Sequence, residues 1–340
     1  MKILLETAAT LRPGNDRGIG RYLQAIRQAN EALGNLLIET ARPIGSGRLS
    51  EFSALPARQL RLRHQDYDIF HAPTPYYSAF GSSRPIVVSI LDLIPLEVRG
   101  HARTGLKARF FHRLAARADV VLTLSKHAAS RIGDRLGIDP TRIVVAPLPA
   151  CLEFNPDGPI ALNLPRRYVA AMADLRTPDP RKRAHWLQQI ASELGKDGVA
   201  LVIAGAGTDK SSIPGTIGLG RISDFDWAAV LRGATFMVYT SAYEGQGMPP
   251  LEAIACGTPV VAMRNTAIPE VVGAAGKLVE EAKSDDASLR RITDACRELL
   301  EDLEQTTNYR AACGEQAKLF SESSFQESVA AAYELAKAGS

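Results

Sequence analysis

Residues Thr235–Met263 have the sequence TFMVYTSAYEGQGMPPLEAIACGTPVVAM. The apolar run up to Thr240 predicts a buried strand, and Pro249–Pro250 suit the first turn of a helix. Gly257 is expected to end that helix before a second strand begins. Such a strand-loop-helix-strand unit is typical of a parallel sheet. Its loop, Glu244–Gly247, falls where ligands of open α/β sheets bind.

The same alternation of short apolar runs and helical stretches continues through both halves of the chain. The predicted strands are Lys2–Leu5, Ile69–His71, Ile86–Leu91, Val120–Leu124 and Arg142–Pro147, then Tyr168–Met172, Ala200–Ala204, Thr216–Leu219, Thr235–Tyr239 and Pro259–Met263. The predicted helices are Gly20–Leu33, Thr104–Ala118 and Lys126–Leu136, then Arg181–Leu194, Asp226–Leu231, Pro250–Ala255 and Leu289–Leu303. We therefore predict an α/β fold with two doubly wound domains.

The length and composition support two domains. With 340 residues, 46% of them apolar and 23% charged, the chain can bury sizeable cores. We place an N-terminal domain at 1–150, a C-terminal domain at 151–320, and a last helix at 321–340 that crosses back to the first domain. The segment Pro147–Pro165 is the expected linker, and this linker and Phe320–Lys337 are candidate hinges.

We expect neither a targeting signal nor a membrane span. No apolar run reaches about 18 residues, and the N-terminal apolar stretch is interrupted at Glu6. The four cysteines lack metal-ligand and disulfide spacing, which favours a reducing compartment. A cytoplasmic protein is therefore expected.

The net charge of +3 hides an uneven distribution. Residues 1–150 hold 21 Lys and Arg against 12 Asp and Glu, a balance of +9, whereas residues 151–340 hold 19 against 25, a balance of −6. A basic N-terminal half attracts nucleic acid, anionic lipid or a phosphorylated substrate. The charge balance alone does not distinguish these partners, so the residues of a site must identify the partner.

The loop and helix start within Thr235–Met263 form the first candidate site. A helix N-terminus with glycines that allow close approach can bind an anion, and we expect Glu244 and Glu252 to face the same cleft. The simpler interpretation is that the glycines make a turn and that a first-turn Glu252 only favours the helix dipole.

The spacing of these residues resembles a family signature. Glu244, seven residues and Glu252, followed by AIACGTPVV, is similar to the signature of retaining glycosyltransferases of family 4, also called glycosyl transferases group 1. That family has the GT-B architecture, so the resemblance implies two Rossmann-like domains facing a cleft. The resemblance spans nearly the whole chain, and it is strongest over 168–280 and weaker over 1–150.

Other stretches are similar to further segments of that family. They are DPRKRAHWL (Asp179–Leu187), GRISDFDWAAVLRGATFMVYTS from Gly220, RGIGRYL (Arg17–Leu23), SILDLIPL (Ser89–Leu96) and LTLSKHAASR around Ser125. In the first, Arg181, Lys182 and Arg183 would begin a helix and oppose its dipole, which favours a bound anion. A solvated basic turn is the alternative interpretation.

The resemblance implies roles for individual residues. Lys182 and Arg181 would neutralise the donor diphosphate, Glu244 would accept hydrogen bonds from donor-sugar hydroxyls, and Glu252 from the ribose. The remaining implied donor-binding residues are Gly18, Gly20, Asp92, Ile222, Gly245, Gln246, Gly247 and Met248. Transfer would retain the anomeric configuration, and the leaving phosphate would help to deprotonate the acceptor. No metal and no cofactor are expected, because cations and a helix N-terminus can stabilise the departing diphosphate.

The expected function is glycosyl transfer from a nucleotide diphosphate sugar. A hexosyl or 6-deoxyhexosyl group would pass from a GDP-mannose-type or related donor to a saccharide or lipid-linked glycan acceptor in cell-surface polysaccharide synthesis. Nucleic acid is not an expected partner. The donor base, the sugar, the acceptor and the oligomeric state cannot be derived from the residues.

Leu91 is the clearest departure from the family pattern, which has a histidine there that reaches the C6 hydroxyl of the sugar. Leucine would instead pack against a methyl group, which favours a 6-deoxyhexose donor. Altered packing alone, with an ordinary GDP-mannose or UDP-glucose donor, is the alternative. The same departure leaves open a catalytically inactive sugar-nucleotide-binding subunit of a glycan-assembly complex. A GT-B epimerase or phosphorylase lacks this glutamate spacing.

Two further patterns have competing interpretations. Asp224-Phe225-Asp226 has the DxD spacing of a metal-binding triad, but Ser223 or Asp224 is expected to cap a helix there, and no metal site is expected. In the helix Thr104–Ala118, preceded by Arg103, cations surround an apolar stripe of Leu106, Phe110, Phe111 and Leu114. That composition suits an anionic membrane surface at the inner face of the cytoplasmic membrane, or the core contact of the domain itself.

Overall fold

The computed structural model describes residues 1–7, 18–40, 50–98, 105–161, 163–177, 179–210 and 213–339. The chain divides into two compact units. The N-terminal unit comprises Met1–Pro149 and Ser321–Ser340, and the C-terminal unit comprises Ala150–Phe320. The expected boundary at residue 150 lies one residue from this division.

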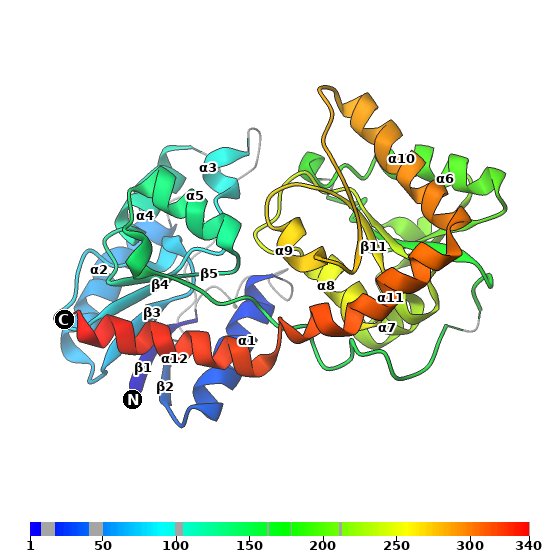
Figure 1. Ribbon diagram of the computed structural model, residues 1–340. Coiled ribbons are helices and arrows are strands. Elements are labelled where there is room, and N and C mark those ends of the chain that lie inside the picture. Colours follow the sequence, from blue (N-terminus) through cyan, green and yellow to red (C-terminus); the bar gives the residue numbers. More distant parts are fainter. Residues whose placement is uncertain are drawn as a thin grey trace. The chain divides into compact units, whose positions relative to one another are not determined.

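The N-terminal unit is a six-stranded parallel sheet flanked by helices (Figure 1). In sheet order its strands are β2 (Leu36–Thr40), β1 (Lys2–Glu6), β3 (Ile69–Ala72), β4 (Ile86–Ser89), β5 (Val120–Thr123) and β6 (Ile143–Val145). Its helices are α1 (Ile19–Ala32), α2 (Ser50–His64), α3 (Ile94–Glu97), α4 (Leu106–Ala115), α5 (Lys126–Leu136) and α12 (Glu322–Ala338).

The C-terminal unit contains a second six-stranded parallel sheet. In sheet order its strands are β12 (Gly276–Val279), β11 (Val260–Met263), β10 (Met237–Tyr239), β7 (Tyr168–Met172), β8 (Ala200–Ala204) and β9 (Thr216–Gly220). Its helices are α6 (Trp186–Lys196), α7 (Asp224–Gly233), α8 (Met248–Ala255), α9 (Ile268–Val272), α10 (Asp285–Glu301) and α11 (Leu303–Lys318). Read from β9 to β12, this is the Rossmann strand order 3-2-1-4-5-6.

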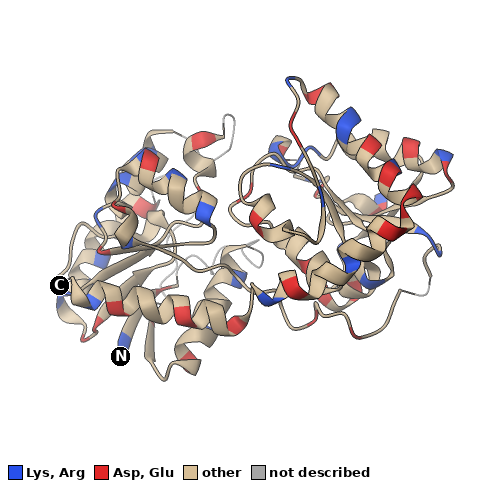
Figure 2. Ribbon diagram, in the orientation of Figure 1, with Lys and Arg blue, Asp and Glu red and all other residues tan. Residues whose placement is uncertain are grey.

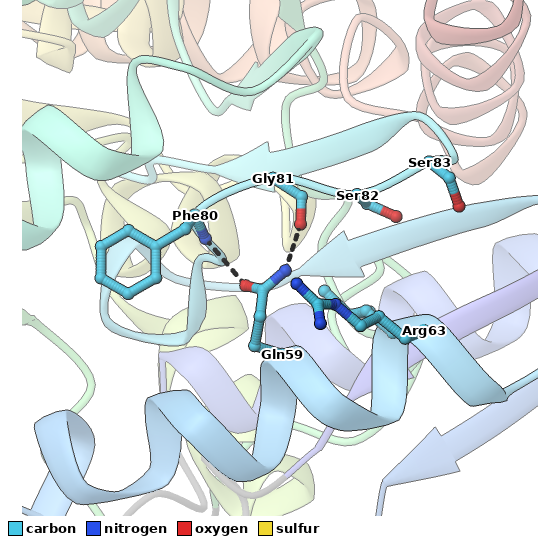
Figure 3. Close-up of a pocket in the computed structure, with 7 residues that line it drawn as sticks. Gln59, Arg63, Phe80, Gly81, Ser82 and Ser83 are labelled. Carbon is cyan, nitrogen blue, oxygen red and sulfur yellow. Dashed lines mark hydrogen bonds between the residues drawn. The ribbon is translucent and has the colours of Figure 1, made fainter.

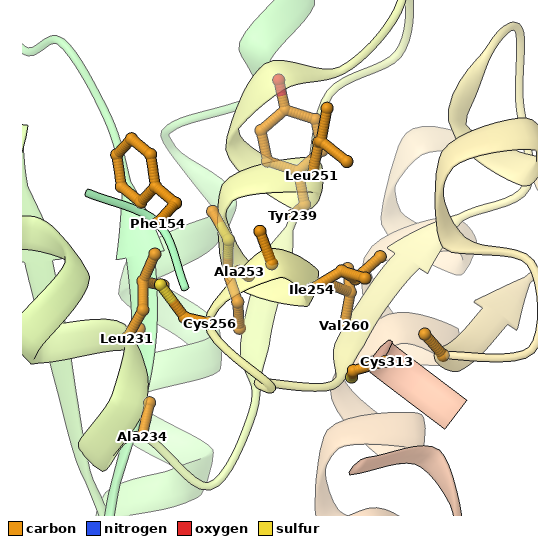
Figure 4. Close-up of a cluster of buried hydrophobic side chains, with 14 of the residues drawn as sticks. Phe154, Leu231, Ala234, Tyr239, Leu251, Ala253, Ile254, Cys256, Val260 and Cys313 are labelled. Carbon is orange, nitrogen blue, oxygen red and sulfur yellow. The ribbon is translucent and has the colours of Figure 1, made fainter. Parts of the chain in front are cut away.

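Alternating strand residues build one core on each face of the second sheet. Ala170, Met237 and Tyr239 belong to a cluster with residues of α7, α8 and α9. Their sequence neighbours Val169, Ala171 and Val238 belong to a cluster with residues of α6 and α10. Figure 4 shows part of the first cluster, in which α8 contributes several of the buried side chains. Helices on both faces of a parallel sheet confirm the predicted doubly wound α/β class.

The sequence analysis missed two of the four edge strands, β2 and β12, and several helices. These two strands are short, and each includes a charged residue, Glu39 in β2 and Lys277 in β12. Helix α2 contains Pro56 and is rich in arginine, which obscured its periodicity. Arg17, Arg103 and Thr104, which belong to predicted segments, lie outside the described residues.

A buried hydrogen-bond network ties α12 to the sheet of the N-terminal unit. The Tyr333 hydroxyl lies 2.9 Å from Nδ1 of His71, and Asn30 donates to the same hydroxyl at 3.2 Å. The other ring nitrogen of His71 lies 2.8 Å from Oγ of Ser89, which in turn lies 2.5 Å from the Tyr22 hydroxyl. The network therefore links the last helix to β3, β4 and α1.

This network predicts a pH-dependent stability. Burial lowers the pKa of His71 to about 3, against about 6.5 for an exposed histidine. Folding favours the neutral ring of His71. The contribution of this ring to the free energy of unfolding is therefore complete above pH 6.5 and is lost as the pH falls toward 3. We expect the free energy of unfolding to fall as the pH is lowered from 6.5 to 5, and to fall more steeply in the wild type than in His71→Gln. The difference between the two slopes should reach up to about 1.4 kcal/mol per pH unit. Urea unfolding at each pH measures the pH dependence of stability in both proteins. Equal slopes would contradict a neutral, buried His71 in the folded state.

Candidate functional site

The strand order of the C-terminal unit creates a topological switch point between β7 and β10. These two strands are neighbours in the sheet, and the chain leaves them toward opposite edges. Ligands of open α/β sheets bind beyond the carboxyl ends of strands at such a point. The segment after β7 leads to Pro180–Lys182, and the segment after β10 leads to Glu244. Both predicted motifs therefore belong to the switch point.

Backbone and side-chain hydrogen bonds hold the two segments together. The backbone N–H of Ala242 donates to the carbonyl of Arg181 at 2.8 Å. The Thr240 hydroxyl donates to the carbonyl of Lys182 at 2.7 Å. Consecutive carbonyls of the basic turn are thus fixed to the loop that follows β10.

Glu244 is the centre of a compact charged cluster. Only 8% of the residue is exposed. Its Oε1 accepts hydrogen bonds from Nζ of Lys182 and from the Tyr239 hydroxyl, the latter at 2.6 Å, and it lies 3.1 Å from Nη1 of Arg181. Lys182 also donates to the Tyr239 hydroxyl at 2.9 Å and lies over its ring, 5.4 Å from the centroid. The structure thus brings the three predicted catalytic residues, Arg181, Lys182 and Glu244, together.

The two cations keep the buried carboxylate ionised. Burial alone would raise the pKa of Glu244, but the charges of Lys182 and Arg181 outweigh it and lower that pKa to about 2. Burial and the neighbouring carboxylate raise the pKa of Tyr239, so its hydroxyl remains a donor. At neutral pH the carboxylate of Glu244 therefore faces two cations and a phenol, and Arg181 is also paired with Asp179 at 3.0 Å.

The basic residues 181–183 do not begin a helix, so that prediction was wrong. Pro180–Lys182 forms a single 3-10 turn, and α6 starts only at Trp186. Arg183 separates them with a left-handed backbone, at φ 49°. No helix dipole opposes these cations. Their partners are carboxylates of the chain itself, which also corrects the alternative of a solvated turn.

Arg183 ties the turn to the segment that joins β12 to the start of α10. Its guanidinium donates to both carboxylate oxygens of Glu281 at 2.7 and 3.2 Å, lies 3.2 Å from Asp285, and lies 4.4 Å from the ring centroid of Trp186. Asn265 bridges the same Glu281 to the carbonyl of Ser241. The next residue, Thr266, has φ 44° and accepts a hydrogen bond from the backbone N–H of Glu244 at 3.0 Å. Two strained non-glycine residues therefore support the cluster.

The remaining motif residues of this loop lead into α8. Gly245, Gln246 and Gly247 are buried, and Met248 begins the helix, partly buried against the core. Gly247 has φ 103°, and a Cβ there would lie 2.8 Å from Ile268, so the turn requires glycine.

Glu252 lies further along α8 and is 3% exposed. Its Oε2 accepts a hydrogen bond from the indole of Trp227 at 3.2 Å. Because α8 has no acidic residue in its first turn, the interpretation of Glu252 as a first-turn charge was wrong. Its predicted contact with ribose stays a prediction.

The other predicted donor-binding residues belong to different elements. Ile222 lies between β9 and α7, packed against the core. In the N-terminal unit, Gly18 caps α1 with φ 58°, and Gly20 lies in the first turn of that helix. Asp92 follows β4, and its Oδ1 accepts a hydrogen bond from the backbone N–H of Ile94 at 2.9 Å. Leu91, beside it, is half-buried.

Sequence reasoning missed several residues of the charged cluster. Tyr239 was assigned only to a buried strand, although its hydroxyl at the carboxyl end of β10 was an available signal. Nothing in the sequence marks Asn265, Thr266 or Glu281 as partners of residues 181–183. The DxD spacing is a helix start, as expected, since Ser223 accepts a hydrogen bond from the N–H of Asp226 at 3.1 Å. Within the described ranges, no group of three or more His, Cys, Asp or Glu residues could hold a metal ion.

Two family models match the chain. The model described as "Glycosyl transferases group 1" matches residues 166–302, and the one described as "Glycosyltransferase Family 4" matches residues 21–153. Together the two models cover most of both units. The chain belongs to the group 1, family 4 glycosyltransferases.

Curated relatives include two bacterial mannosyltransferases. The chain is 29% identical over 250 residues to the Escherichia coli O-antigen chain mannosyltransferase B, covering 66% of this chain and 64% of that protein. It is 32% identical over 206 residues to an MMP alpha-(1->4)-mannosyltransferase of Mycolicibacterium hassiacum, covering 55% of this chain and 48% of that protein. The chain thus spans less than two thirds of either relative.

Solved structures of similar fold are glycosyltransferases. Sucrose-phosphate synthase from Thermosynechococcus elongatus superposes with a TM-score of 0.75 at 17% identity over 100% of both chains. WaaG, a glycosyltransferase involved in lipopolysaccharide biosynthesis, gives a TM-score of 0.68 at 14% identity over 97% of this chain and 98% of that chain. Anabaena HepE in complex with UDP and glucose gives 0.68 at 18% identity over the same shares. These likenesses confirm the predicted GT-B fold.

The left-handed backbone of Arg183 gives a matched pair of variants. Arg183→Ala and Arg183→Gly both remove the contacts with Glu281, but only glycine adopts φ 49° without strain. We expect the glycine variant to be more stable than the alanine variant by about 1 kcal/mol, the reverse of the usual order. Urea unfolding of the two variants checks this, and an alanine variant of equal or greater stability would contradict the strained backbone.

Proposed function

We propose that this chain transfers a hexosyl or 6-deoxyhexosyl group from a nucleotide diphosphate sugar to a saccharide or lipid-linked glycan acceptor in cell-surface polysaccharide synthesis. The observation that carries the proposal is the cluster of Glu244, Lys182, Arg181 and Tyr239 at the switch point of the C-terminal unit. Family membership supports the reaction class, and the two mannosyltransferase relatives favour a GDP-mannose-type donor.

The chemistry of the reaction matches the charges of the cluster. Glycosyl transfer from a nucleotide sugar develops negative charge on the departing diphosphate, so a catalyst needs fixed positive charge beside the diphosphate oxygens. The Lys182 side chain is 35% exposed and can reach a ligand. The Arg181 side chain is 10% exposed and is paired with Glu244. Two cations can stabilise the leaving group without a metal ion.

Lys182 has two states in this proposal. In the free protein it is bonded to Glu244 and to the Tyr239 hydroxyl. When the donor binds, the Lys182 side chain turns from Glu244 to the diphosphate. Glu244 is then free to accept hydrogen bonds from hydroxyls of the donor sugar. Retention of the anomeric configuration, with the leaving phosphate accepting the proton of the acceptor hydroxyl, needs no protein base. The carboxylate of Glu244 would be a weak base, because its pKa is lowered to about 2 and cations engage it.

A second candidate function follows from Leu91. A sugar-nucleotide-binding subunit without turnover, part of a glycan-assembly complex, would tolerate the loss of the family histidine at that position. Binding of a donor without release of nucleoside diphosphate would identify this function.

Removal of the Lys182 charge is the first test. Lys182→Ala should lower turnover roughly 10²- to 10³-fold, as the loss of one charge-stabilising group does. Lys196→Ala removes an exposed lysine of α6 that pairs with Glu193 on the same helix, and it should leave turnover unchanged. Release of nucleoside diphosphate from candidate donors measures both rates. Similar rates in the two variants would contradict the role of Lys182.

Independence of a metal ion is the second test. Activity should persist in excess EDTA, because Lys182 and Arg181 supply the positive charge. Abolition by the chelator, with recovery on addition of manganese, would contradict this and would revive a metal role for Asp224 and Asp226.

Donor choice is the third test. If Leu91 forms an apolar wall against C6 of the sugar, a 6-deoxyhexose donor should be used at least as well as its hexose parent, because a pocket gains roughly 1–3 kcal/mol from a buried methyl group. Leu91→His should shift preference toward the hexose. Competition between a hexose donor and its 6-deoxy counterpart measures this, and a strong wild-type preference for the 6-hydroxyl donor would overturn it.

A further inference from the structure

Helix α4 of the N-terminal unit has two chemically different faces. Phe111 and Leu114 are buried and form a core cluster with Leu55 of α2. This part of the predicted stripe is therefore the contact of the unit with its own core. Leu106 is 83% exposed and Phe110 is 37% exposed, so the other half of the stripe faces outward.

The outward face combines these apolar side chains with arginines. At about 100° per residue, Leu106, Arg109, Phe110 and Arg113 share one side of the helix, and Arg117 continues it just beyond the last turn. All five are exposed. The sequence contains no Asp or Glu between Glu97 and Asp119. Figure 2 shows Lys and Arg against Asp and Glu along both units, and residues 52–65 are a second stretch with arginines and without Asp or Glu.

A neighbouring loop extends this surface. Phe80 is 50% exposed, and its ring lies 6.4 Å from that of Phe110, centroid to centroid. The side-chain amide of Gln59 on α2 holds the loop by bonding the backbone N–H of Phe80 and the carbonyl of Gly81 (Figure 3). Arg63, Phe80 and Ser83 line a cavity of about 580 Å³ there. A guanidinium and a hydroxyl beside an aromatic ring are groups that can bind a lipid phosphate.

We propose that the outward face of α4, with Phe80 and the cavity at Arg63, docks on an anionic phospholipid bilayer. Cations within a Debye length of such a surface are attracted to it, while side chains such as Leu106 and Phe110 enter the boundary between headgroups and acyl chains. Nucleic acid would engage the arginines but gains little from an exposed leucine and phenylalanine. The combination of both kinds of side chain is what favours a bilayer. This surface does not depend on the proposed function, because neither Lys182 nor Glu244 takes part in it.

Vesicle sedimentation without any donor tests the proposal. The wild type should bind vesicles of phosphatidylcholine with phosphatidylglycerol, bind pure phosphatidylcholine far more weakly, and dissociate at high salt. Arg109→Gln with Arg113→Gln should lower the partition coefficient roughly 25-fold, about 5-fold for each cation removed. Leu106→Ser with Phe110→Ser should lower it at least about 10-fold at low salt, where the wild type binds.

The matched control uses two arginines of the other unit. Arg166→Gln with Arg290→Gln removes the same charge from exposed positions of the C-terminal unit and should leave binding within about 2-fold. Equal binding to neutral vesicles, or equal losses in the two arginine pairs, would overturn the proposal. So would binding to a DNA duplex but not to vesicles, or self-association through Phe110 seen by analytical ultracentrifugation without vesicle binding. Thermal unfolding of each variant confirms that the fold is retained.

Discussion

The ion pairs of Glu244 are the interaction on which the candidate site depends. A carboxylate that is only 8% exposed would be protonated if it stood alone, and Lys182 and Arg181 reverse that tendency. The two cations and the Tyr239 hydroxyl in turn are held in place by the carboxylate. In a largely buried setting such interactions are stronger than on the surface, so the cluster holds Lys182 beside the position proposed for the diphosphate before a ligand arrives.

The rest of the C-terminal unit positions this cluster. The strand order places the ends of β7 and β10 side by side, and hydrogen bonds from Thr240 and Ala242 fix the basic turn to the loop. Strained backbone at Arg183 and Thr266 is maintained by contacts with Glu281 and with the N–H of Glu244. The two apolar layers on the faces of the sheet supply the rigidity that these strained residues require.

The sequence predicted what local patterns encode. The fold class followed from alternating apolar runs and helices, and the loop before α8 from the prolines and glycines of residues 245–250. It did not predict the turn at Arg183, because Pro180 looks like a helix start and the partners Glu244 and Glu281 are distant in the sequence. Tyr239 and Thr266 join the cluster only through strand order, which is a property of the whole sheet. Strands β2 and β12 were missed because they are short and each includes a charged residue, which weakens the apolar pattern.

Calorimetric titration of nucleoside diphosphates into the wild type, Lys182→Ala and Glu244→Gln tests the central claim most directly. If Lys182 leaves Glu244 to bind the diphosphate, Lys182→Ala should weaken binding at least about 10-fold, the loss of one charge-assisted hydrogen bond. Glu244→Gln should bind the nucleotide as tightly as the wild type or more tightly, because it removes the competing carboxylate, yet it should turn over more slowly. Equal weakening in both variants, or affinity indifferent to Lys182, would contradict the account.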